Sequence, residues 1–414
     1  MPPFTRRWFS SRFTSKASPF PRAFTATNFR MASSTAAALY ALTLSASPAS
    51  SAPDDASAKA HHVKNGFDNP WNSFTSPFDK QTQILWRMLS GKANRPDTTP
   101  PTVPVHKPVF LPSRETPTLR ATWLGHACYY VEFPSGLRVL FDPVFEDRCS
   151  PFSWLGPKRY TEPPCQIMDI PTIDAVVISH NHYDHLSLPT VREIHKRHPN
   201  CHFFVPLGNK EWFDKTGIPN ATELDWWDER DILLSPTKSA TQVDPADGNT
   251  DSKLADITAR IGCLPCQHFS ARTPFDRCKT LWASCAPFSD TGYRSVPTLP
   301  DHVDDHSPEH NYPSCPAFKQ VGEYRGPFDL GLIPIGAYQP RWFMSPMHAD
   351  PHDAVEIFRD TQCKRALGMH WGTWVLTEED VLEPPRKLKE ALKKHEYPET
   401  GVFDICDIGE SREF

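Results

Sequence analysis

The chain has 414 residues, of which 39% are hydrophobic and 22% are charged, and its formal net charge at pH 7 is −5. This length and composition are typical of a globular protein with one large domain or two to three smaller ones. The mildly acidic balance argues against a broad basic surface that binds nucleic acid. Eleven scattered cysteines, an odd number, are typical of reduced thiols rather than a disulfide framework. Cys263 and Cys266 are the one close pair, and without a second pair we favour buried thiols over a redox or metal element.

The N-terminal segment differs from the rest of the chain in charge. Residues 1–53 contain no Asp or Glu, whereas six Arg and Lys residues are spread among Ser, Thr and Phe. This composition is typical of a mitochondrial transit peptide, and a disordered basic tail is the alternative. Residues 35–46 are weakly apolar and fall short of the roughly 20 residues that span a bilayer. We therefore predict that residues 1–60 are a transit peptide or disordered, and that the protein is mitochondrial and peripheral to the membrane.

A second segment, residues 61–116, is rich in Pro and polar residues but carries aromatic and apolar anchors. They lie in "FDNPWNSF" (67–74) and "QILWRMLSG" (83–91). A plain linker has no need of so many aromatic residues. We therefore expect residues 61–116 to form an N-terminal arm that packs on a main domain of residues 117–414.

Short strands alternate with helices through the main domain. Residues 118–133 and 137–145 predict a hairpin around Pro134-Ser135-Gly136, and the nearly continuous apolar run 173–180 predicts a strand buried on both faces. Further strands are expected at 201–208 and 329–336, a helix at 188–198, and a second helix with Asp350 as N-cap and Pro351 in its first position. Polar inserts at 239–256 and 294–312 predict surface loops. This alternation favours an α/β (α+β) fold with sheets covered by helices.

The stretch "ISHNHYDHLS" (178–187) places three histidines and an aspartate directly after the buried strand. In an extended segment His180 and His182 point the same way, and the turn that follows brings Asp184 and His185 to face a second position. The carboxyl end of a strand is where open α/β sheets bind ligands. We therefore expect a site for two metal ions, with a solvated polar loop as the alternative.

These residues resemble the His-x-His-x-Asp-His motif of the metallo-β-lactamase superfamily, which implies a four-layer αββα sandwich with one or two metals at its edge. The likeness continues along the chain: His268, Asp290 and His370 each follow closely behind an apolar run. Seven candidate ligands in order are a stronger signal than the motif alone.

Short sequence motifs outside the seven candidate ligands are similar to those of the N-acyl-phosphatidylethanolamine-hydrolysing phospholipase D family, over roughly residues 65–390. They include "NPW" (69–71), "TWLGHA" (122–127), "FDP" (141–143), "LDWWD" (224–228), "HADP" (348–351) and "HWGTW" (370–374).

The resemblance implies a zinc-dependent phosphodiesterase that releases N-acylethanolamine and phosphatidic acid from a phospholipid at a membrane surface. It implies that His180, His182 and His268 hold one Zn²⁺, that Asp184, His185 and His370 hold a second, and that Asp290 bridges them. Asp184 and His348 are the predicted catalytic residues, and His348 would orient or protonate groups around the leaving oxygen. A packed histidine is the alternative for His348. The resemblance also implies a homodimer.

Several residues allow a structural interpretation as well as a functional one. We expect His126 to support the metal ligands and not to bind metal itself. His302, His306 and His310 recur every four residues and would catch a metal only if helical, so a solvated loop is favoured. Four tryptophans line an acyl channel or belong to the core. They are Trp226, Trp227, Trp342 and Trp374.

One departure from the family pattern concerns the approach to Asp290. Only residues 285–289 separate "LWAS" from "DTGY", where family members have a longer stretch with a strand, and Pro287 interrupts even this short piece. Two alternatives therefore stay open. One is another ester or lactone hydrolase of the same fold, and the other is a catalytically impaired homologue that binds membrane lipid.

Overall fold

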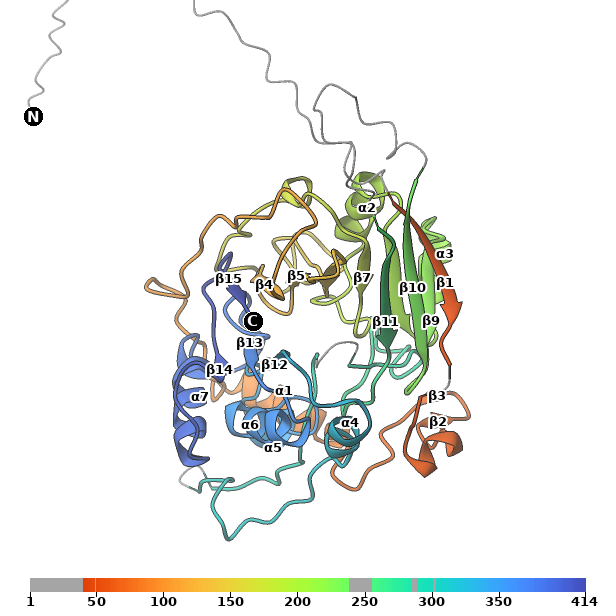
Figure 1. Cartoon of the computed structure of the whole chain (residues 1–414). Coiled ribbons are helices and arrows are strands. Elements are labelled where there is room, and N and C mark those ends of the chain that lie inside the picture. The colour runs from red at the N-terminus through yellow and green to blue at the C-terminus, as the bar shows by residue number, and fades with distance from the viewer. Residues whose placement is uncertain (1–39, 49, 238–254, 285–288, 301–302) are drawn as a thin grey trace, which may run out of the picture. The chain divides into compact units, whose positions relative to one another are not determined.

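A seven-stranded sheet forms the first layer of the fold (Figure 1). The computed structural model describes residues 40–48, 50–237, 255–284, 289–300 and 303–414. The strand order is β15-β4-β5-β6-β7-β8-β9, with antiparallel pairing from β15 to β6 and parallel pairing from β6 to β9. The strands are β4 Arg120–Trp123, β5 Tyr129–Glu132, β6 Arg138–Phe141, β7 Ala175–Val177, β8 His202–Pro206, β9 Ala221–Leu224 and β15 Ser411–Glu413.

The predicted hairpin around residues 134–136 is confirmed as β5 and β6. The first arm is two strands instead of one, because the chain turns between β4 and β5. Gly125 and His126 both have positive φ there, at +99° and 52°. This turn carries His126 to the same end of the sheet as the histidine-rich stretch after β7.

The two faces of this sheet pack against different partners. Ala175 and Val177 face the second layer, whereas Val176 and Ile178 face the outer helices. The outer helices are α2 Leu188–Arg197 and α3 Lys210–Thr216. Both faces of β7 are therefore buried, as its nearly continuous apolar sequence predicts.

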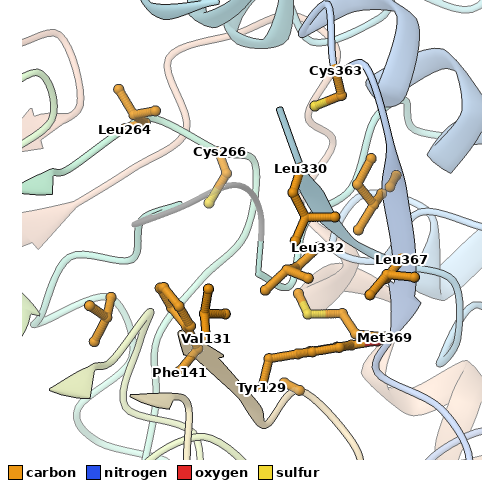
Figure 2. Close-up of a cluster of buried hydrophobic side chains, with 14 of the residues drawn as sticks. Tyr129, Val131, Phe141, Leu264, Cys266, Leu330, Leu332, Cys363, Leu367 and Met369 are labelled. Atoms are coloured by element: carbon orange, nitrogen blue, oxygen red, sulfur yellow. The ribbon is translucent and has the colours of Figure 1, made fainter. Parts of the chain in front are cut away.

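The second layer consists of two three-stranded sheets, ordered β1-β10-β11 and β12-β13-β14. Their strands are β1 Tyr40–Ala46, β10 Glu229–Pro236, β11 Ile257–Gly262, β12 Gly331–Pro334, β13 Ala366–Met369 and β14 Phe403–Asp404. Figure 2 shows side chains of the core between the layers, where Tyr129, Val131 and Phe141 lie near Leu332 and Met369.

Helices cover the outer side of β12 to β14. Their bounds are α4 Ala317–Arg325, α5 Arg341–Met344, α6 Pro351–Asp360 and α7 Glu383–Lys394. Buried side chains of α4, α6 and α7 join the core of the second layer. α6 begins as predicted, because the Asp350 carboxylate accepts a hydrogen bond from the Asp353 amide and Pro351 opens the helix. The expected αββα order of layers is confirmed.

The two sheets of the second layer are separate, and the chain segment that contains Asp290 lies between β11 and α4 in the sequence. Among the described residues between β11 and α4 there are isolated bridges but no strand. A cavity of about 350 Å³ lies between β11 and the large sheet, lined by Val139, Phe141, Val177 and Ile261 among others. Residues 285–288 lie outside the described residues, so the fold brings Asp290 to its place without a described strand.

The prediction of a transit or disordered segment over residues 1–60 is wrong from Tyr40 onward. β1 pairs antiparallel with β10, from Tyr40 opposite Pro236 to Ala46 opposite Arg230. Tyr40, Leu42 and Leu44 alternate with more exposed residues, which is the period of a strand at a sheet edge. Residues 1–39 lie outside the described residues.

The arm of residues 61–116 lies against the main domain in the structure. The imidazoles of His61 and His62 lie 2.7 and 2.9 Å from the two carboxylate oxygens of Asp225. Arg87 forms an ion pair of 2.8 Å with Glu378. The arm contributes the two-stranded sheet of β2 His62–Val63 and β3 Gly66–Phe67, and helix α1 Gln81–Leu89. No helix of the described residues is long and apolar enough to cross a membrane.

Parts of both polar inserts lie outside the described residues. Residues 239–254 lie outside it, so the loop expected there stays a prediction. In 294–312 the described residues form no helix, so a metal-binding helical face is wrong for this part, and His302 lies outside the description. The loop is not wholly on the surface either, because His306 is mostly buried with Nε2 2.7 Å from an Asp350 carboxylate oxygen.

Candidate metal centre

The histidine-rich stretch lies directly after β7, at the carboxyl end of the large sheet. Residues 182–186 form a turn, since the amides of His185 and Leu186 both donate to the carbonyl of His182. His180 and His185 are buried, and His182 and Asp184 are partly exposed. The turn therefore presents these side chains to two adjacent positions, as the sequence predicts.

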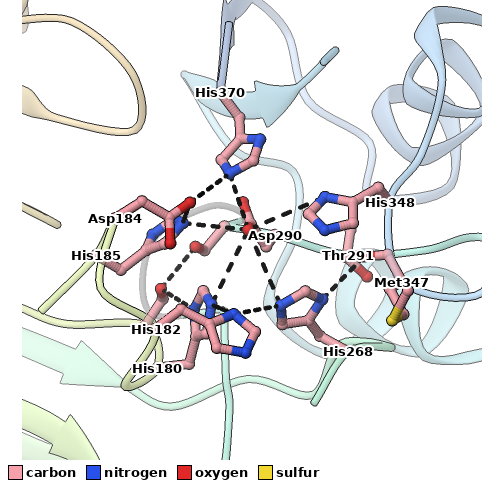
Figure 3. Close-up of polar contacts among 12 residues, drawn as sticks. His180, His182, Asp184, His185, His268, Asp290, Thr291, Met347, His348 and His370 are labelled. Atoms are coloured by element: carbon pink, nitrogen blue, oxygen red, sulfur yellow. Dashed lines mark hydrogen bonds and ion pairs between the residues drawn. The ribbon is translucent and has the colours of Figure 1, made fainter. Parts of the chain in front are cut away.

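The first group consists of His180, His182 and His268 with Asp290. Nδ1 of His182 lies 2.7 Å from Nε2 of His180 and 3.3 Å from Nε2 of His268. Both Nε2 atoms lie 3.9 Å from Oδ2 of Asp290. Three nitrogens and one carboxylate oxygen thus converge on one point (Figure 3).

The second group consists of Asp184, His185 and His370 with the same Asp290. Oδ2 of Asp184 lies 3.4 Å from Nε2 of His185 and 3.4 Å from Nε2 of His370. Oδ2 of Asp290 lies 3.1 and 2.9 Å from these nitrogens. One oxygen of Asp290 therefore stands between the two groups, where a bridging ligand would lie (Figure 3).

The geometry of both groups fits metal ions. Ligands at 2.0–2.1 Å around a tetrahedral Zn²⁺ are about 3.3 Å apart, close to the separations within each group. Nε2 of His185, Nε2 of His370 and Oδ1 of Asp290 are buried and make no hydrogen bond among the described residues. Buried polar atoms are rarely left without a partner. Imidazoles and carboxylates in this number are the ligands that Zn²⁺ takes.

The two carboxylates of the second group attract positive charge. Burial opposes ionisation, yet the charge of His185 holds the pKa of Asp184 well below its usual range, and His185 and His370 do the same for Asp290. Burial also opposes a charge on His370, but Asp290 raises its pKa to about 9. Two buried carboxylates thus draw positive charge to the place that a metal ion would fill.

The first group has the opposite character. Burial lowers the pKa of His182 to about 3 and that of His268 to about 4. These imidazoles are neutral at pH 7, and the neutral form is the one that binds a metal. The Nδ1–H of His268 donates to the Met347 carbonyl at 2.9 Å, which leaves its Nε2 free to face the group.

Asp142 supports the second group and was not among the predicted site residues. Its Oδ2 accepts a hydrogen bond of 2.8 Å from Nδ1 of His185, so Nε2 of this ring faces the metal position. Its Oδ1 accepts from the Ser179 amide at 2.7 Å. Asp142 belongs to the short motif "FDP" (141–143), and this motif is the sequence feature that could have indicated it.

His126 holds Asp184 from the other side. Its Nε2 lies 3.0 Å from Oδ2 of Asp184, and its carbonyl accepts the His370 amide at 3.0 Å. The ligand atoms of His126, Asp184, His185 and His370 also lie within 4.8 Å of one another, so the supporting role of His126 stays a prediction. His126, Asp142 and His370 have φ of 52°, 39° and 63°, a region that side chains with a Cβ rarely adopt. Such strain gathers at functional sites.

His348 faces the bridging oxygen without joining either group. Its Nδ1 is 4.0 Å from Oδ2 of Asp290, and its ring centre is 5.1 Å from that of His268 and 5.3 Å from that of His370. The ring is buried, and Nδ1 makes no hydrogen bond among the described residues. The catalytic role of His348 and the packed histidine both stay predictions.

The four tryptophans lie in different surroundings. Trp226 is buried against His61 and Trp71, so it belongs to the core and not to an acyl channel. Trp374 lies edge-on to His126 and lines a cavity of about 30 Å³ beside His370, which is too small for an acyl chain. Trp227 contacts Tyr324, and Trp342 contacts Lys80 of the arm.

Comparisons with known proteins agree with this geometry. Residues 137–371 match the sequence model of a family described as a Beta-lactamase superfamily domain. The chain is 35% identical over 375 residues to N-acyl-phosphatidylethanolamine-hydrolyzing phospholipase D 1 of Caenorhabditis elegans, across 85% of this chain and 94% of that protein. It is 34% identical over 269 residues to the mitochondrial enzyme of the same name from Saccharomyces cerevisiae, across 65% of this chain and 50% of that protein. The chain therefore belongs to the N-acyl-phosphatidylethanolamine-hydrolysing phospholipase D family, within the β-lactamase superfamily.

Proposed function

We propose that this chain is a zinc-dependent phospholipase D-type phosphodiesterase that hydrolyses N-acyl-phosphatidylethanolamine. The observation that carries the proposal is the single oxygen of Asp290, which lies within 3.9 Å of nitrogens in both groups. The names of the worm and yeast relatives supply the substrate. The seven residues of the two groups would hold two Zn²⁺ ions.

The reaction adds water across one phosphodiester bond. The water oxygen bonds to phosphorus, the bond from phosphorus to the oxygen of N-acylethanolamine breaks, and a proton passes to that leaving oxygen, which gives phosphatidic acid as the second product. Two bound Zn²⁺ ions would lower the pKa of the attacking water and offset the charge that develops on the phosphate.

The residues of the chain supply position and proton transfer. Asp184, which lies between His126, His185 and His370, would accept a proton from the attacking water. His348 lies across Asp290 from Asp184 and His185 (Figure 3), and it would orient or protonate the leaving oxygen. A proton transfer of this kind typically contributes 10²–10⁴-fold to the rate.

A membrane surface as the place of reaction is supported by exposed apolar side chains on three segments. Contiguous exposed apolar side chains are uncommon on soluble proteins and mark interaction sites. The exposed residues are Leu85, Trp86, Met88 and Leu89 of α1, Phe152, Trp154 and Leu155 of the loop after β6, and Phe275.

The first of these segments is linked to the metal centre through aromatic contacts. Phe269 packs edge-on against His182 with ring centres 4.6 Å apart, and Phe78 packs against Phe269 at 5.1 Å. Phe78 lies three residues before α1. The exposed face of α1 therefore lies at the end of a short chain of contacts that begins at a metal-site histidine.

The other two segments are tied to the site by hydrogen bonds. Arg272 donates to the carbonyls of Asn181 and Leu186 at 2.8 Å, which fixes the loop that carries Phe275. The indole of Trp374 donates to the Asp147 carbonyl at 3.2 Å, at the base of the loop after β6. All three apolar segments would meet a lipid surface together with the metal centre.

A mitochondrial, peripheral location belongs to the same proposal. It rests on the name of the yeast relative and on the basic, acid-free composition of residues 1–53. A homodimer remains a prediction, to be checked by the mass of the chain in solution by light scattering.

The two alternatives differ from the proposal in what they predict. A hydrolase of another ester or lactone would cleave soluble substrates without lipid or detergent. A catalytically impaired lipid-binding homologue would lack metal, and the buried position of Asp290 between both groups counts against it.

The proposal is tested with the full chain, loaded with zinc and incubated with N-acyl-phosphatidylethanolamine in mixed micelles. Released N-acylethanolamine and phosphatidic acid are measured by mass spectrometry, with His182→Ala as the blank. We expect both products from the natural chain and a loss of both in the variant. Products that persist in His182→Ala, or a zinc-loaded chain that releases neither, would contradict the proposal.

A further inference from the structure

Among the described residues that precede Asp290 after β11, no strand supports the chain. The amide of Ser284 donates to the Leu264 carbonyl at 2.9 Å, and the next described residue is Ser289. Beyond Asp290, the amide of Gly292 donates to the Gln267 carbonyl at 2.7 Å. A backbone hydrogen bond therefore holds the chain on the C-terminal side of Asp290.

The N-terminal side is held by a side chain. The hydroxyl of Ser289 lies 2.6 Å from Oγ of Ser179 and 3.0 Å from Oδ2 of Asp142. All three side chains are buried. Ser179 directly precedes the first ligand of the histidine motif, and Asp142 follows β6. This hydroxyl thus joins the residue before Asp290 to two strand ends of the large sheet.

The three side chains form one hydrogen-bonded cluster with two ligands of the metal centre. Oδ2 of Asp142 lies 2.8 Å from Nδ1 of His185 and accepts the hydroxyl of Ser179 at 2.7 Å. Oγ of Ser179 lies 2.9 Å from Nδ1 of His180 and accepts the hydroxyl of Ser289. Each of the two histidines therefore has its Nδ1 paired within the cluster.

The cluster orients a ligand in each metal group. With Nδ1 paired, the rings of His180 and His185 turn Nε2 toward the metal positions. One belongs to the first group and the other to the second. The cluster thus orients one histidine in each group and at the same time fixes the residue next to Asp290.

We propose that Ser289 is a positioning residue for the metal centre, which locks Asp290 to the correctly oriented His180 and His185 through Ser179 and Asp142. This inference rests on the metal-binding part of the proposed function but not on the identity of the substrate. Loss of a supporting hydrogen bond at a metal site typically weakens metal binding 10–100-fold.

The test compares Ser289→Ala with Ser289→Thr in the full chain, with Thr361→Val as the matched control. Thr361 is a buried hydroxyl at the end of α6 that donates to the Ile357 carbonyl at 2.6 Å. Zinc affinity is measured by competition with a coloured chelator, and ligand geometry by the visible absorption of the Co²⁺-substituted proteins.

We expect about a tenfold or greater loss of zinc affinity and an altered Co²⁺ spectrum in Ser289→Ala. Ser289→Thr, which keeps the hydroxyl, should recover most of the affinity, and Thr361→Val should bind zinc like the natural chain. If Ser289→Ala does not fold, Ser289→Cys takes its place, since the thiol is a weaker donor in a similar volume.

Natural affinity and an unchanged spectrum in the variant without the hydroxyl would overturn the inference. An equal loss in Ser289→Thr would overturn it as well, because the hydroxyl would then not matter. A chain that shows the expected zinc losses but hydrolyses no N-acyl-phosphatidylethanolamine leaves the role of Ser289 standing and contradicts the proposed substrate.

Discussion

The two layers of the fold hold their parts of the metal centre in different ways. In the large sheet, His180 to His185 leave the end of a strand that is buried on both faces and paired on both sides. In the second layer, Asp290 follows a stretch without a described strand. Strand pairing fixes the position of the first region, whereas side-chain hydrogen bonds of Ser289 and the backbone bond from Gly292 to Gln267 fix that of the second.

This difference indicates where the centre is vulnerable. Strand ends in a packed sheet resist displacement because the core on both faces would have to move with them. A residue held by hydroxyls and a carboxylate moves once a single partner is lost. We therefore expect substitutions around Asp290 to act mainly on metal binding and those within β7 to act mainly on stability.

The largest expected effect is that of Asp290→Ala. It removes the one oxygen shared by both groups, so activity toward N-acyl-phosphatidylethanolamine should fall by more than the 10–100-fold that a supporting residue costs. Metal analysis of the purified variant should find at most one ion per chain. Two tightly bound ions in this variant would show that the second layer contributes no bridge.

His348→Gln separates catalysis from metal binding. Since His348 lies 4.0 Å from Asp290 and belongs to neither group, the variant should retain its zinc while turnover falls roughly 10²–10⁴-fold. Steady-state kinetics in mixed micelles and zinc analysis of the same sample provide the check. Full turnover with unchanged substrate affinity would remove the assigned role.

Asp142→Asn tests the link between the two layers. The amide keeps the shape of the side chain but cannot accept at both positions in the same way, so His185 loses its fixed orientation. We expect zinc affinity to fall 10–100-fold while the unfolding temperature of the metal-free protein changes little. Loss of the fold without any change in the affinity of the folded fraction would assign Asp142 a structural role.

The smallest expected effect concerns the cavity. Val139→Ile adds one methyl group on the face of β6 that lines the cavity, and should raise the free energy of unfolding by about 0.5–1 kcal/mol. The matched control is Val176→Ile, on the face of β7 packed against the outer helices, where the same addition should destabilise by about 1 kcal/mol or more. Thermal unfolding measures both, and equal shifts would contradict the difference between the faces.

The parts of the site that the sequence predicted are those encoded by local spacing. His180, His182, Asp184 and His185 lie within six residues after an apolar run, and a turn suffices to place them. The cap of α6 at Asp350 is equally local. Patterns of this kind do not depend on what the rest of the chain does.

The parts that escaped prediction depend on distant contacts. Nothing near Ser289 in the sequence indicates that it contacts Ser179, which lies 110 residues away. For Asp142, the sequence offers only the short motif "FDP", which is similar to a motif of the family. The alternation of Tyr40, Leu42 and Leu44 fits a strand. The acid-free composition of residues 1–53 instead favours a transit peptide, so composition alone does not predict β1. Its partner strand β10 lies almost 190 residues later.

A crystal structure of the zinc-loaded chain with anomalous data collected at the zinc absorption edge tests the central claim most directly. The account predicts two anomalous peaks per chain, about 3.5–4 Å apart, with an oxygen of Asp290 between them. The first peak should touch His180, His182 and His268, and the second Asp184, His185 and His370. A single peak, or two peaks with Asp290 turned away from both, would contradict it.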